Sequence, residues 1–184
     1  NESIKEKAWP GCVLLGAKDG KIFIHEAVGY HSYDKKRKTR ASDIFDIASI
    51  TKVIATTSGI MKLYDEDLLK LKTPVVDYIP KFKGTDNKYK AIKSKITVHD
   101  LLTHTSGLPA FKAYHLIDES IEKKIDSIYN TVPIASPGDT MIYSDIGAII
   151  LGKIVETISG VSLDQYVDSL IFLPLGIIEI NLFK

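Results

Sequence analysis

The first clear pattern along the chain is a pair of β-rich runs separated by a short polar turn. The segment GCVLLGAKDGKIFIHEAVGY places apolar and β-branched residues on both sides of Asp19 and Gly20. An Asp-Gly pair between two such runs is a strong hairpin signal, because both residues tolerate the positive φ angles of a tight turn. The pattern therefore predicts strands over residues 11–17 and 21–29.

From Ser49 onward the spacing of apolar residues changes to that of a helix. The pattern ends at the acidic turn YDEDLL, and Pro74 and Pro80 interrupt the segment that follows. A spacing of three and four residues predicts an amphipathic helix. The residues that share its predicted face are Val53, Ile54, Thr57, Ile60, Met61 and Tyr64.

The second half of the chain contains four further helical patterns. Thr97 is a suitable N-cap for a short helix over VHDLLTH, which the turn TSGLP stops. A polar helix is expected near 117–130, before the turn SPGD. A long helix with isoleucines at 146, 149, 150, 154 and 158 is closed by Gly160, and a shorter helix follows near 162–171.

These elements give one N-terminal hairpin, residues 11–29, and a mainly helical body over about 44–184. The sequence thus predicts an α+β fold in which strands and helices are segregated along a single partial domain, 1–184. A two-stranded sheet is marginal by itself. We expect either that the helices cover the hairpin or that strands outside these 184 residues complete its sheet.

Composition and charge exclude several classes of function. The 184 residues are 45% hydrophobic, and 24 basic against 23 acidic residues give a net charge of +1. No overall field favours nucleic acid or an anionic membrane surface, so a small neutral or mixed-charge ligand fits better.

The one cysteine, Cys12, cannot form an intramolecular disulfide. No apolar run approaches the roughly 20 residues of a membrane span.

The candidate chemistry begins with a serine three residues before a lysine. Side chains at positions i and i+3 of a helix share a face, so the lysine amine can reach the serine hydroxyl. This pattern occurs three times, at Ser32, Ser49 and Ser120, but only Ser49 opens an apolar helix, where partial burial can tune the lysine. The residues alone leave two readings of Ser49 open, a catalytic nucleophile or a helix cap.

Four sequence blocks resemble, in order and spacing, the superfamily of class C β-lactamases, penicillin-binding proteins and related esterases. The blocks are FDIASITK, ITVHDLLTHTSGLP, SPGDTMIYSDIGAIILGKIVETISG and YVDSLIFLPLGI. The resemblance implies a β-lactamase/transpeptidase-like fold and a serine acyl hydrolase that forms an acyl-enzyme on Ser49. It also implies an ester, β-lactam or D-amino-acid peptide as substrate, no cofactor or metal, and a periplasmic or extracytoplasmic location.

The resemblance assigns further residues to the site. Lys52 is the lysine partner of Ser49, and Tyr143 matches the tyrosine of the family's Tyr-x-Asn element, which relays a proton from the serine to the leaving group. Asp145 stands where the family has asparagine, which removes an amide donor and favours small esters or D-amino-acid peptides over β-lactams. His104 is expected to support the turn beside the site. His99 and His104 lack a third metal ligand nearby.

The family's third element, Lys-Thr-Gly or His-x-Gly on a later strand, is absent from these 184 residues. A truncated or proteolysed chain, a second chain that completes the sheet, and a natural remnant are the three explanations. The chain is therefore expected to be weakly active or inactive. The alternative function is a non-catalytic module that binds peptidoglycan-like peptides or a partner protein. An incomplete sheet also predicts self-association, because an unpaired strand edge recruits other strands.

Overall fold

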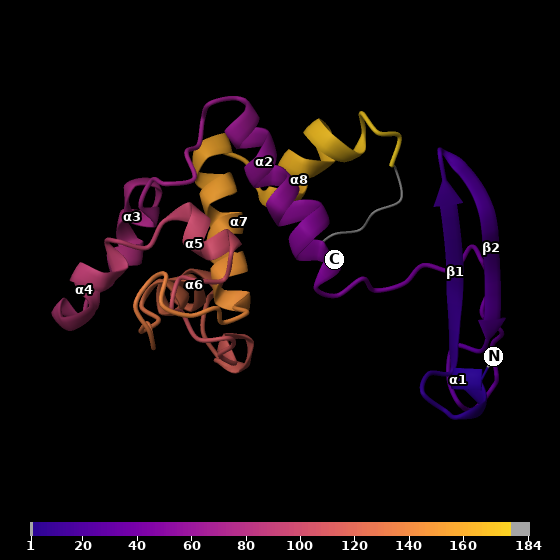
Figure 1. Cartoon of the computed structure of the whole chain (residues 1–184). Helices are drawn as coiled ribbons and strands as arrows, with labels where there is room; N and C mark the ends of the chain where they lie inside the picture. The colour runs from indigo at the N-terminus through magenta and orange to yellow at the C-terminus, as the bar shows by residue number, and fades with distance from the viewer. Residues whose placement is uncertain (1, 178–184) are drawn as a thin grey trace. The chain divides into compact units, whose positions relative to one another are not determined.

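The computed structural model describes residues 2–177. The chain forms two compact units that divide between Ile47 and Ala48. Both strands belong to the first unit, and the helices from Lys52 onward belong to the second (Figure 1). This arrangement confirms the α+β class with strands and helices segregated along the chain.

The N-terminal unit is built on the expected hairpin. Strand β1 (Gly11–Lys18) pairs antiparallel with β2 (Lys21–Gly29), after a short helix α1 (Glu2–Lys5). Asp19 and Gly20 connect the strands with φ angles of 52° and 74°. Positive φ at both central residues matches the right-handed twist of a hairpin, so the Asp-Gly signal predicted this turn correctly.

The charged loop after β2 folds around one carboxylate. Asp43 accepts hydrogen bonds from His31 Nε2 at 2.7 Å, from Arg37 Nη2 at 2.8 Å and from the backbone N–H of Arg40 at 2.6 Å. Together these bonds hold the pKa of Asp43 at about 2, and the Arg40 N–H contributes most.

The helical unit contains eleven helical segments within its described residues, 48–177. In chain order these are η1 (Lys52–Thr57), α2 (Ser58–Asp65), α3 (Val75–Tyr78), η2 (Pro80–Lys83), α4 (Asn87–Lys93), α5 (Val98–Leu102), η3 (Tyr114–Leu116), α6 (Ile121–Tyr129), α7 (Asp145–Ser159), α8 (Leu163–Val167) and η4 (Asp168–Phe172).

Helix α7 is the centre of this unit. It packs against η1, α2, α5 and α8, and Figure 1 shows it running between α5 on one side and α2 and α8 on the other. Its hydrophobic face is fully buried, because isoleucine, leucine and valine recur at helical spacing. The buried side chains of this face are Ile146, Ile150, Leu151, Ile154 and Val155.

The ends of α7 and α5 match the sequence signals. Gly160 closes α7 with a φ of 75°, and Thr97 begins α5 with a capping box in which Thr97 and Asp100 satisfy each other's backbone N–H groups. Helix α6 begins later than expected, because Ser120 caps it. Helix α4, which Asp86 caps, was not predicted from the sequence.

The face of η1 and α2 that packs inward differs from the apolar face expected from the sequence. Of the six residues predicted to share a face, only Ile60 is buried, and Met61 is 63% exposed. The buried face instead includes Ala55, Gly59 and Leu63. A Cβ on Gly59 would lie 3.3 Å from Val155 of α7, so small residues decide where the helices approach.

Within residues 2–177, no single helix has the length and apolar composition to cross a membrane. Helix α7 and the segment Leu163–Phe172 meet both criteria only when taken together, and they are bent by 71° at their junction.

Candidate active site

Ser49 lies in a turn at the start of the helix that becomes η1. The N–H of Thr51 donates to Ala48 O at 3.0 Å, and the N–H of Lys52 donates to Ser49 O at 3.1 Å. Ala48 has a φ of 43°, which is unfavourable for a residue with a Cβ. Such strain is common at functional sites, and here it precedes an exposed serine at a helix N-terminus.

The Lys52 side chain joins Ser49 to Asp145. Its Nζ donates to Ser49 Oγ at 2.9 Å and forms an ion pair with Asp145 Oδ1 at 2.9 Å. Partial burial by itself lowers the pKa of Lys52, but hydrogen bonds to Asp145 and Tyr143 outweigh it, so the pKa is raised overall. Lys52 is therefore held as an ammonium in this arrangement.

Tyr143 lies beside the Lys52 ammonium. Lys52 Nζ lies 5.5 Å from the centroid of its ring. Hydrogen bonding with Ser49 lowers the pKa of the Tyr143 phenol, and the Lys52 ammonium lowers it further. The structure thus brings Ser49, Lys52, Tyr143 and Asp145 together from the start of η1 and the start of α7.

The turn after α5 holds the segment that carries Tyr143. The N–H of Ile142 donates to His104 O at 2.8 Å, and the N–H of Asp145 donates to Ala110 O at 2.9 Å. Between them, Ser144 Oγ donates to Pro109 O at 2.7 Å. Three bonds on the two sides of Tyr143 fix its backbone and also set where α7 begins.

His104 makes direct contact with this segment. Its Nδ1 accepts the Ser144 N–H at 3.1 Å, and its ring lies against the Tyr143 ring with centroids 4.6 Å apart. Burial lowers the pKa of His104, and the Lys52 charge lowers it further. An Nδ1 that accepts a hydrogen bond carries no proton, so the remaining ring proton lies on Nε2.

Gly107 shapes the turn that contains His104. Its φ is 74°, and a Cβ at this position would lie 2.1 Å from Ala135 O. The close approach lets Gly107 O accept the Ile134 N–H at 2.8 Å. The string THTSGLP therefore forms a backbone clamp on residues 134–145, and only glycine fits at its tightest point.

A groove of about 610 Å³ begins at Lys52 and Asp145 and continues along α7. Its walls come from η1, α7 and α8. The α7 residues that face it follow the spacing of one helical face and are Asp145, Ala148, Ile149, Gly152, Lys153 and Glu156. Of these six, only Asp145 was expected at the site from the sequence; the other five follow from Asp145 at intervals of three and four residues along the helix.

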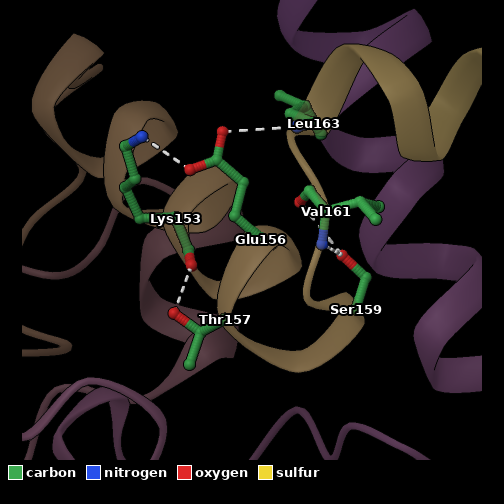
Figure 2. A network of polar contacts seen from close by, with 6 residues as sticks. All are labelled: Lys153, Glu156, Thr157, Ser159, Val161 and Leu163. Atoms are coloured by element: carbon green, nitrogen blue, oxygen red, sulfur yellow. Dashed lines mark hydrogen bonds and ion pairs between the residues drawn. The ribbon is translucent and has the colours of Figure 1, made fainter.

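Figure 2 shows a polar network that includes the far end of this groove. Glu156 Oε2 accepts from Lys153 Nζ at 2.5 Å, and Glu156 Oε1 accepts the N–H of Leu163 at 3.3 Å. Glu156 thereby satisfies a backbone donor at the start of α8 and ties that helix to α7.

The other two Ser-x-x-Lys pairs lie in different surroundings. Ser32 donates to Asp34 in the charged loop, and Ser120 caps α6 by accepting the N–H of Lys123 at 3.5 Å. Within residues 2–177, Ser49 is the one of these three serines whose hydroxyl has a described hydrogen bond from a lysine side chain.

Comparison with protein families gives one match over the whole chain. The family model described as Beta-lactamase matches residues 1–184. A Salmonella heidelberg (strain SL476) protein named "Putative D-alanyl-D-alanine carboxypeptidase" is 32% identical over 186 residues, which cover 94% of this chain. The chain spans 43% of the length of that relative.

Solved structures show the same similarity in three dimensions. The octameric penicillin-binding protein homologue from Pyrococcus abyssi has a TM-score of 0.78 at 30% identity, over 95% of this chain and 41% of that one. EstCE1, a hydrolase with promiscuous acyltransferase activity, has a TM-score of 0.81 at 25% identity, over 95% and 49% of the two chains. Both likenesses confirm the β-lactamase/transpeptidase-like fold expected from the sequence blocks.

Proposed function

Because the chain belongs to the Beta-lactamase family, we propose that the protein containing it is a serine acyl hydrolase with Ser49 as nucleophile. The observation that carries this proposal is the 2.9 Å contact between Lys52 Nζ and Ser49 Oγ at a helix start, with Tyr143 beside both. A relative named as a putative carboxypeptidase and a hydrolase with promiscuous acyltransferase activity, both among the similar proteins, support the same class of reaction.

In the proposed acylation step, Ser49 Oγ attacks the acyl carbon while its proton passes to the Tyr143 phenolate. The bond from the acyl carbon to the leaving group then breaks, and Tyr143 returns the proton to that group. The Lys52 ammonium stabilises the phenolate before the attack. Backbone N–H groups at the helix start favour the oxyanion that forms on the carbonyl oxygen.

Deacylation repeats these transfers with water as the nucleophile. Water gives a proton to Tyr143 as its oxygen bonds to the acyl carbon. Ser49 Oγ then leaves with the proton that Tyr143 returns. The acid product and the free serine result, and no redox step is involved.

Asp145 favours small esters or D-amino-acid peptides over β-lactams. A carboxylate offers only acceptors, whereas an amide at this position would also donate to a substrate carbonyl. Because Asp145 also holds Lys52 charged through a 2.9 Å ion pair, the proton relay through Tyr143 does not depend on a neutral lysine.

Covalent labelling tests the nucleophile. We expect a fluorophosphonate to add one label to the protein and to react faster than a labelled penicillin. Neither reagent should label Ser49→Ala. Intact mass spectrometry measures both adducts. The matched control is Ser120→Ala, which removes the serine of another Ser-x-x-Lys pair and costs only about 1 kcal/mol of helix capping. Labelling that survives Ser49→Ala would rule out the proposed nucleophile.

A further inference from the structure

The position of Asp145 bears on which acyl group the site accepts. Lys52 Nζ lies 2.9 Å from both Ser49 Oγ and Asp145 Oδ1, so these two oxygens are no farther apart than twice that distance. In an acyl-enzyme the carbonyl carbon is bonded to Ser49 Oγ. A substituent on the adjacent carbon therefore lies within reach of the Asp145 carboxylate, whose side chain is 41% exposed.

The charges around this position favour a cation. Asp145 and Lys52 cancel each other, and the phenolate form of Tyr143 that the mechanism requires adds one negative charge. In the adjoining groove, the described residues Asp145, Glu156 and Asp164 outnumber the two lysines, Lys52 and Lys153. Hydrogen bonding with Ser162 lowers the pKa of Asp164, which keeps this carboxyl ionised. The site and the groove thus share an excess of negative charge.

The hydrogen-bonding capacity of Asp145 leads to the same class of ligand. An ionised carboxylate only accepts, so it pairs poorly with the carbonyl oxygen of an acylamino group and well with an ammonium. We propose, on the basis of the proposed function, that the site prefers acyl donors with a free amine on the carbon next to the scissile carbonyl, and that Asp145 determines this specificity. Esters and amides of unblocked amino acids are the corresponding substrate class.

The ammonium takes no part in bond making. The bond between the acyl carbon and the ester oxygen or amide nitrogen breaks as in the proposed mechanism, and the amine leaves unchanged on the acid product. Its contribution is binding, so the effect of Asp145 falls on the ratio of rates between substrates. Replacing Asp145 also removes the ion-pair partner of Lys52, which slows all substrates alike. The ratio of rates between two substrates cancels this common loss.

The first experiment measures binding without catalysis. Ser49→Ala protein is titrated calorimetrically with alaninamide, N-acetylalaninamide and propionamide, each alanine compound in both enantiomers. We expect one enantiomer of alaninamide to bind roughly 10-fold tighter or more than the other two compounds. Adding Asp145→Asn should remove most of this difference. Equal binding of alaninamide and propionamide would overturn the proposal.

The second experiment measures turnover of the matching p-nitroanilides by the unaltered active site. We expect the ratio of kcat/KM for alanyl over N-acetylalanyl substrate to fall roughly 10- to 100-fold in Asp145→Asn. Asp118→Asn is the matched control, since it removes an exposed carboxylate outside the groove and should leave the ratio unchanged. An unchanged ratio in Asp145→Asn would also overturn the proposal.

The two experiments separate failure of this inference from failure of the proposed function. Turnover that persists in Ser49→Ala removes the proposed nucleophile, while the calorimetric comparison still tests the preference for an amine. Turnover that depends on Ser49 but favours the N-acetyl substrate removes the amine preference and leaves the hydrolase assignment standing.

Discussion

At the scale of single residues, His104 contacts the segment that carries Tyr143 and the tyrosine ring itself. The imidazole accepts the Ser144 N–H through Nδ1 and lies against the tyrosine ring. Protonation of Nδ1 replaces this acceptor with a donor, and the N–H of Ser144 then loses its partner. A positive charge also appears near the Lys52 ammonium. Burial and the Lys52 charge lower the pKa of His104, although Asp145 raises it, so the neutral imidazole is favoured in the folded protein.

We therefore expect the rate of fluorophosphonate labelling to fall more steeply below pH 6.5 in the unaltered protein than in His104→Asn. Asparagine keeps an acceptor close to the position of Nδ1, tolerates the φ of 59° and does not titrate. His104→Ala should label roughly 10-fold more slowly at neutral pH, because Ser144 loses its acceptor. Labelling rates measured from pH 5 to 8 distinguish the three proteins.

Acid also affects folding, so the folded fraction has to be followed in the same samples. The pKa of His104 is lower in the folded than in the unfolded protein, and the folded state therefore binds fewer protons near pH 6.5. Stability consequently decreases as the pH falls through this range. His115→Asn serves as a control, since His115 is exposed and outside the site. Parallel pH profiles for unaltered protein and His104→Asn would contradict the assigned role.

At the scale of elements, the turn after α5 and the start of α7 act as one unit. The turn supplies carbonyl acceptors at His104, Pro109 and Ala110, and the segment before α7 supplies the donors. The buried face of α7 then anchors this segment to the core. Tyr143 therefore takes its position from backbone contacts on both sides, although its own side chain is half exposed.

A pair of glycine substitutions tests this backbone clamp. Gly107→Ala combines a positive φ with a Cβ 2.1 Å from Ala135 O, so we expect a loss of about 2 kcal/mol or more of unfolding free energy and a slower labelling rate. Gly138→Ala has a similar φ of 88° but no atom within 4 Å of the added Cβ. It should cost only about 1 kcal/mol.

Urea denaturation gives the free energy of unfolding of each glycine variant. The labelling rates are measured at a pH where the unaltered protein and both variants are folded. If the two glycine variants lose equal stability, the clash at Gly107 does not determine the turn.

At the scale of the whole molecule, the hairpin is a two-stranded sheet with unpaired edges among the described residues. Strands β1 and β2 pair only with each other among residues 2–177, so each keeps one edge without a ladder partner. Large apolar side chains are exposed on both strands, including Leu15 at 54% and Phe23 at 73%. Unpaired edges and exposed apolar surface together promote strand addition.

We expect the 184-residue chain to self-associate through this hairpin at micromolar concentration. Sedimentation velocity should show a concentration-dependent rise in mass that Leu15→Lys with Phe23→Lys abolishes, because lysines on an edge oppose pairing. Leu116→Lys is the control, since Leu116 is 75% exposed but lies outside the hairpin. A monomeric unaltered chain over the whole concentration range would refute this expectation.

Several features were determined by local sequence. The Asp19–Gly20 turn, the Thr97 cap and the closure of α7 at Gly160 depend on preferences of a few adjacent residues, and the structure has them where the sequence placed them. The order of the sequence blocks was also enough to identify the fold and the family. Such signals can be recognised in a single sequence because they do not depend on contacts with residues distant in the chain.

Other features were decided only by tertiary packing. Periodicity showed an apolar face on the helix after Ser49, but contact with α7 through Gly59 selected a different face for burial. The Lys52–Asp145 ion pair and the groove along α7 likewise require segments about ninety residues apart in sequence to meet. The positive φ of Ala48 is another feature that the local sequence pattern did not predict. The sequence by itself therefore determined the elements and the chemical groups. Their relative positions, and hence the charge around Ser49, depended on long-range packing that no local pattern encodes.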